Sequence, residues 1–168
     1  MSISLHALAV EAPKARLAAL RAILAKAEAH CAARKIAPEA LLGMRLFPDM
    51  FTLTRQVQLA SDFAKGPAAR LAGVEVPAMP DVETGFADLA ARIARTQAFL
   101  DTISPAALDG AEGREIVFKA GGGERRMQGE AYLVHYAAPN FYFHLVTAYD
   151  LLRHGGVEIG KRDFLGVV

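Results

Sequence analysis

One stretch near the C-terminal end of the chain holds the polar side chains whose types and spacing could support chemistry. Residues 129–166 have the sequence GEAYLVHYAAPNFYFHLVTAYDLLRHGGVEIGKRDFLG, and the central part is apolar or small on every side. This pattern predicts a helix buried in the interior. Asn140 and His144 are four residues apart and share one face of that helix, with Thr147 a turn further on. Polar groups in such a helix need partners from other elements or from a ligand.

Metal binding is the first chemistry to consider for these side chains. Two ligands on one helix must be three or four residues apart, and no two of the five histidines have that spacing. His144, Asn140 and Gln56, which comes from an earlier helix, would supply one imidazole and two amides. Amides bind Zn or Ni poorly. The simpler interpretation is that Asn140 and His144 bond backbone groups freed by Pro139.

Proton transfer and ligand binding are the other roles open to this helix. If the chain is an enzyme, His144 is the candidate catalytic residue or lone metal ligand, while Asn140 and Gln56 orient the substrate or water. Tyr136 and Thr147 are further candidate substrate-binding residues on the same helix. Its many aromatic side chains could line a small-molecule pocket, although aromatic residues are more often part of the core.

The composition of the chain excludes several classes of protein. Its 19 Lys and Arg against 18 Asp and Glu give a net charge of +1, so neither nucleic acid nor a membrane is an expected partner. No apolar stretch is long enough to span a membrane, and the first residues lack the pattern of a signal peptide. The single Cys31 cannot form an internal disulfide, and we expect a reduced, cytoplasmic protein. The 168 residues fit one domain, 1–168.

Four segments with helical periodicity must position the candidate site. Proline and capping residues at their starts and glycine or proline at their ends predict helices over about 4–33, 47–72, 84–103 and 130–154. The second helix is expected to begin at Phe47–Asp49, and the third to be capped by Asp81 or Thr84. Pro13 and Pro139 should kink the first and last helices.

The remaining segment predicts strands, and the charged residues predict which helix faces meet water. Residues 114–128 contain β-formers around three glycines and predict a hairpin, so the expected fold is all-α, a four-helix bundle with a small β-hairpin insertion between its third and fourth helices. Arg55, Gln58 and Asp62 share a face of the second helix that we expect to be solvated, and Arg92 lies off the apolar face of the third. High Ala and Leu content with little net charge predicts a homodimer.

Three segments of the chain resemble a known family. They are RLFPDMFTLTRQVQLASDFAKGPAARLAGVEVP (45–77), ARIARTQAFL (91–100) and APNFYFHLVTAYDLLRHGGVEIGKRDFLG (138–166). They are similar to a bacterial family of unknown function within the DinB/YfiT-like metalloenzyme superfamily. The resemblance implies a DinB-like four-helix bundle with a long crossover, and the wider superfamily is often dimeric.

The resemblance also implies where a metal would lie and how this chain departs from that site. The superfamily's usual site has one His on the second helix and an HxxxH pair on the last long helix. His144 corresponds to the second member of that pair, Asn140 stands in place of the first, and Gln56 lies near the position of the second-helix ligand. A degenerate or absent metal site is therefore implied, with at most weak Zn or Ni. The functions to compare are a hydrolase or transferase acting on an unknown small molecule and a noncatalytic dimeric binding or scaffolding protein.

Overall fold

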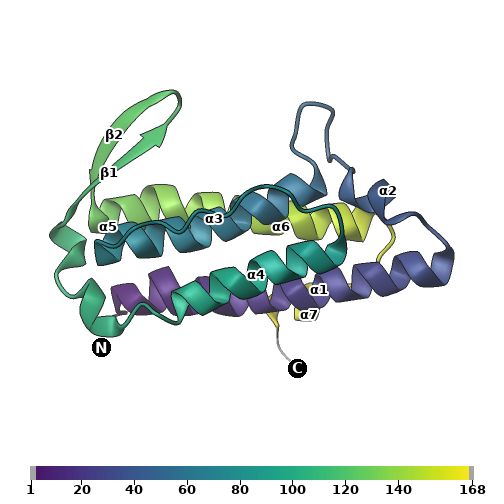
Figure 1. Cartoon of the computed structure of the whole chain (residues 1–168), viewed down its shortest axis with the longest axis horizontal. Coiled ribbons are helices and arrows are strands. Elements are labelled where there is room, and N and C mark those ends of the chain that lie inside the picture. Colours follow the sequence, from purple (N-terminus) through teal and green to yellow (C-terminus); the bar gives the residue numbers. More distant parts are fainter. Residues whose placement is uncertain (1–2, 167–168) are drawn as a thin grey trace.

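The computed structural model describes residues 3–166 as a bundle of four long helices with a hairpin at one end (Figure 1). Three short helices complete it, and none of the helices within residues 3–166 has the length and apolar character that a membrane crossing requires. The expected all-α bundle with its hairpin insertion is confirmed. The long helices are α1 (Ala12–Arg34), α3 (Leu53–Ala72), α4 (Phe86–Leu100) and α6 (Ala138–His154), and the short ones are α2 (Pro38–Leu42), α5 (Gly129–Tyr132) and α7 (Lys161–Leu165).

A long crossover joins the second and third helices of the bundle. Residues 73–85 leave the end of α3, run back along the bundle and enter α4, so that α3 and α4 point in the same direction (Figure 1). α6 follows the hairpin and packs against α3 in the opposite direction, because Tyr132, just before it, contacts Arg70 while His144 contacts Gln56. The candidate site therefore lies between two antiparallel helices.

Proline changes two of the long helices without ending them. A π-helical turn, Ala7–Glu11, precedes Pro13, and another, Leu133–Ala137, precedes Pro139. Pro has no N–H and its ring clashes with the preceding turn, so a wider turn accommodates it with little loss of hydrogen bonding. A π-helical turn thus precedes each proline, and each helix continues through it.

The starts of two helices differ from the sequence prediction. α3 begins at Leu53, where the side chain of Thr52 accepts a hydrogen bond from the Arg55 N–H, so the predicted start at Phe47–Asp49 is wrong. These residues form turns before the helix. α4 is capped by Gly85 rather than by Asp81 or Thr84, because the carboxylate of Asp88 accepts the Gly85 N–H at 3.1 Å.

The hairpin consists of β1 (Glu115–Ala120) and β2 (Gly123–Gln128), paired antiparallel. Ile116 and Phe118 alternate with exposed residues on β1 and are buried, which attaches the hairpin to the bundle. Gly129 follows β2 where the chain passes Ala111 so closely that a Cβ would lie 1.9 Å from its carbonyl oxygen. Only glycine fits this approach.

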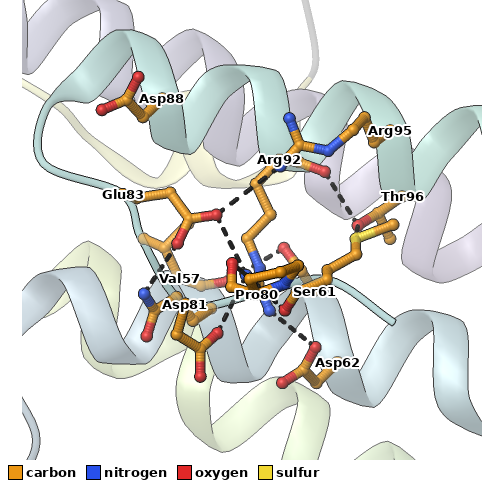
Figure 2. Close-up of polar contacts among 12 residues, drawn as sticks. Val57, Ser61, Asp62, Pro80, Asp81, Glu83, Asp88, Arg92, Arg95 and Thr96 are labelled. Carbon is orange, nitrogen blue, oxygen red and sulfur yellow. Dashed lines mark hydrogen bonds and ion pairs between the residues drawn. The ribbon is translucent and has the colours of Figure 1, made fainter. Parts of the chain in front are cut away.

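A buried arginine ties the crossover to the bundle (Figure 2). The Arg92 side chain on α4 is 0% exposed, and its guanidinium lies 2.9 Å from Asp62 of α3 and 3.0 and 3.1 Å from Asp81 and Glu83 of the crossover. It also donates to the Pro80 carbonyl at 3.3 Å. Burial alone would lower the pKa of Arg92, but the neighbouring carboxylates raise that pKa above its ordinary value. Arg92 therefore stays charged.

The polar face of α3 is covered, which corrects the prediction that it is solvated. Gln58 is 5% exposed and donates to Glu83 at 2.9 Å, Arg55 pairs with Asp81, and Asp62 binds the buried arginine. Gln58 is buried, and Arg55 and Asp62 stay partly exposed, because the crossover brings complementary charges onto this face, an arrangement that helical periodicity does not encode.

We expect Arg92→Met to reduce the free energy of unfolding by about 3–5 kcal/mol, because it leaves the buried carboxylate of Glu83 without its nearest cation. Arg95→Met is the matched control, since its side chain is 55% exposed and 3.8 Å from the same Glu83. That control should cost less than about 1 kcal/mol. Urea unfolding of the two variants measures the difference, and equal losses would contradict the role given to Arg92.

Candidate functional site

The structure brings Gln56 and His144 together at the contact between α3 and α6. His144 Nδ1 lies 2.7 Å from Gln56 Oε1. Both residues are buried, at 1% and 7% exposure, so the hydrogen bond is shielded from water. Two residues 88 positions apart in the sequence thus form the polar centre of this helix pair.

The hydrogen bonds determine which imidazole nitrogen is free. Gln56 Nε2 donates to the Phe51 carbonyl at 3.4 Å, which turns Oε1 toward His144. His144 Nδ1 therefore carries the proton and donates, and Nε2 carries the lone pair. Within residues 3–166, Arg92 Nε is the only unpartnered side-chain nitrogen or oxygen that is shielded from solvent. His144 Nε2 has no protein partner either, so solvent reaches it.

Burial and a nearby cation keep His144 neutral. Burial lowers the pKa of His144 to about 4, and the positive charge of Arg55 lowers it in the same direction. At neutral pH the imidazole is therefore a hydrogen-bond acceptor at Nε2 and a donor at Nδ1.

Aromatic rings hold the imidazole in place. The Phe63 ring of α3 stacks on it with centroids 5.5 Å apart and planes 20° apart, and Phe143 meets it edge-on at 5.3 Å. Phe63 also meets Tyr136 at 5.9 Å. Tyr136 is thereby linked to His144 through an aromatic neighbour rather than by a direct polar contact.

Two of the candidate residues bond to their own helix. Asn140 Nδ2 donates to the Tyr136 carbonyl at 2.7 Å, and Thr147 Oγ1 donates to the Phe143 carbonyl at 2.7 Å. Tyr136 belongs to the π-helical turn before Pro139, so Asn140 satisfies a backbone group there, which agrees with the simpler interpretation of this residue. Asn140 shares a helix face with His144, and one of its two amide N–H donors is used by the Tyr136 carbonyl.

These donors do not fit a zinc or nickel site. The Nδ1 of His144 is occupied by Gln56 and the Asn140 amide by a carbonyl, which leaves Nε2 as the one imidazole ligand. Among residues 3–166, no group of three or more His, Cys, Asp or Glu side chains could hold a metal ion. What the arrangement offers is a neutral, oriented hydrogen-bond acceptor open to solvent.

The helix that carries His144 is not buried on every side, contrary to the sequence prediction. Tyr142, Phe143 and Val146 of α6 are 40%, 57% and 40% exposed. Phe51, whose carbonyl binds Gln56, is 52% exposed. Phe143 meets His144 edge-on, whereas Tyr142 and Val146, each two residues from His144, lie on the opposite side of α6. Phe63 was not predicted as a site residue, because its only signal in the sequence is its place beside the inward-facing positions of α3.

Comparisons with known proteins agree with this architecture. Residues 5–165 match the model of a family described as "Domain of unknown function (DUF1993)". The chain is also similar to the crystal structure of a DinB family member protein from Shewanella denitrificans, with 40% sequence identity and a TM-score of 0.91. That similarity covers 98% of this chain and 93% of the other. No curated protein matches.

We expect the low pKa of His144 to make stability depend on pH. The unfolded chain takes up a proton near pH 6.5 and the folded protein only near 4, so stability is lost as the pH falls through this interval. The loss should be about 2 kcal/mol between pH 7 and pH 5. His144→Phe should lack this contribution. Urea unfolding at both pH values tests it, and identical pH dependence in the two proteins would contradict a neutral, buried His144.

Proposed function

This chain belongs to the DUF1993 family, and from that premise we propose that it binds a small molecule at His144, between α3 and α6, without a resident metal ion. The observation that carries the proposal is the free Nε2 lone pair on a neutral, oriented imidazole. The ligand would present an N–H or O–H donor to this atom.

The surroundings of His144 support binding by preorganisation. Gln56 holds the tautomer and Phe63 holds the ring plane, so little side-chain freedom would be lost when a ligand binds. Exposed apolar side chains, including Phe51 and Phe143, would contact the body of the ligand. Thr147 uses its one donor within α6 and would contribute only its acceptor oxygen, whereas Asn140 uses one of its two N–H donors there and keeps the other and its Oδ1.

A hydrolase or transferase is the second candidate, and one observation favours it. The Nδ1–H of His144 donates to the amide oxygen of Gln56 while Nε2 is free. A general base that is oriented by a neighbouring group has this arrangement. A general base works best with a pKa near the working pH, and the pKa of about 4 at His144 is well below that. Binding is therefore the leading function, and proton transfer would require the ligand to raise this pKa.

A screen of small alcohols, phenols and amides by thermal shift tests the proposal. A ligand at 100 times its Kd should stabilise the protein by about 2.7 kcal/mol. His144→Phe removes the lone pair and retains an aromatic ring against Phe63, so it should abolish the response. His135→Phe is the matched control, because His135 is exposed on the same continuous helix and should leave the response unchanged.

The same purified samples test the metal. We expect substoichiometric Zn and Ni by elemental analysis when neither is added, since one imidazole and two amides form a weak site for these ions. Near-stoichiometric metal that disappears in His144→Ala would overturn the metal-free proposal. Hits that bind His144→Phe as well as the wild type would overturn the binding site.

We also propose that a second copy of the chain covers exposed apolar side chains of α6 and of the segment before α3. Phe143 and Val146 of α6 and Phe51 before α3 are large, apolar and exposed, and a net charge of +1 provides little repulsion between copies. The homodimer expected from the composition would use this surface.

Sedimentation of the wild type should then give a dimer at about tens of micromolar protein. This concentration is far above the Kd of a standard-sized interface. Phe143→Glu should shift it toward monomer, because a charge would be buried in the contact. Val134→Glu is the matched control, since Val134 is also exposed and precedes Phe143 by nine residues, on the opposite side of the helix. A monomeric wild type would contradict the assembly.

A further inference from the structure

A cavity lies beneath the hairpin, at the end of α3 that carries Arg70. It has a volume of about 210 Å³ and is bounded by α3, by β1 and by the segment around α5. Four aromatic side chains and three charged ones contribute to its lining: Phe63, Phe118, Tyr132, Tyr136, Asp62, Arg70 and Lys119. His144 is not among its lining residues.

The aromatic rings form the apolar part of the cavity. Phe118 on β1 meets Tyr136 at 4.5 Å and Tyr132 at 4.8 Å between ring centroids, in tilted orientations. Phe63 meets Tyr136 from α3 at 5.9 Å and 61°. Rings at such angles present both faces and edges, which suits a planar aromatic guest.

Arg70 supplies an anion-binding group at the same cavity. Its guanidinium has five N–H donors and makes one hydrogen bond, to the Tyr132 hydroxyl at 3.3 Å. No carboxylate in residues 3–166 lies within 4.0 Å of it. A Cβ at Gly66 would lie 2.7 Å from Arg70 Nη1, so glycine provides the space in which the guanidinium folds back along α3.

The one acid in the lining does not cancel this positive charge. Asp62 binds Lys65 at 2.8 Å and Arg92 at 2.9 Å, so its carboxylate is already compensated by two buried cations. Lys119 adds a second positive side chain at the rim. The cavity thus combines aromatic walls with a planar, bidentate donor that has no anionic partner.

We propose that this cavity binds a single-ring aromatic carboxylate, with the ring among Phe63, Phe118 and Tyr136 and the carboxylate on Arg70. The volume suits such a ligand, because an apolar cavity of about 150 Å³ holds benzene. Arg70 follows Gln56 by fourteen residues on α3, about 21 Å along the helix. The anion-binding end of the cavity is therefore far from Gln56, while Phe63 is shared by the cavity and the His144 site.

Titration of the full chain with 4-fluorobenzoate and 4-fluorobenzamide, followed by fluorine NMR, tests the proposal. The two probes have the same ring and differ in charge. We expect the carboxylate to bind about tenfold more tightly, as a charge-assisted hydrogen bond implies, and to weaken with added NaCl. Arg70→Met should remove this preference and leave the amide unchanged. Arg153→Met, at an exposed arginine of α6, is the matched control and should retain it.

Two further results keep the test decisive if Arg70→Met does not fold. Gly66→Ala favours the helix but displaces the guanidinium, so it should lower the affinity for 4-fluorobenzoate several-fold. Two of the four tyrosines line the cavity, so their fluorescence should also respond to the carboxylate. Equal affinity for both probes, a salt-independent affinity, or no binding of either at about 10 mM, the weak limit for a ligand of this size, would overturn the proposal.

Discussion

The charge of Arg92 is the constraint on which the arrangement of the helices depends. An arginine cannot lose its proton in a protein, so a side chain that is 0% exposed must be surrounded by oxygen atoms. Those oxygens come from Asp62 on α3 and from the crossover, through Asp81, Glu83 and the Pro80 carbonyl. The crossover therefore lies along α3 and α4 in a single position, because any other would leave a buried charge unpaired.

The ionic cluster and the His144 site share α3, and this links stability to the chemistry of the site. Arg55 pairs with Asp81 of the crossover on one side of the helix. On the adjoining side, its positive charge contributes to the low pKa of His144, and Gln56, the next residue, orients the imidazole. The crossover thus helps to set the electrostatic environment of His144 without contacting it.

The family relationship explains the fold more than the chemistry. A DinB family member with 40% identity shares nearly the whole architecture, but a shared fold does not transfer a reaction. In this chain the two positions where the superfamily is expected to supply further imidazoles hold Gln56 and Asn140. Gln56 binds His144 directly and Asn140 binds its own helix, so both amides take part in hydrogen bonds in this structure.

Local patterns determined the helices, the hairpin and the irregular turns at Pro13 and Pro139, because periodicity and backbone chemistry act over a few residues. They also placed Gln56 and His144 on or beside inward faces, and the family resemblance put both in one site. The direct hydrogen bond between them, across 88 positions, comes from the tertiary structure. The burial of Arg92 and Gln58 was decided by the tertiary structure alone. A polar side chain is exposed or buried according to what covers it, and here the cover is a crossover whose path follows from long-range pairing of charges rather than from any local pattern.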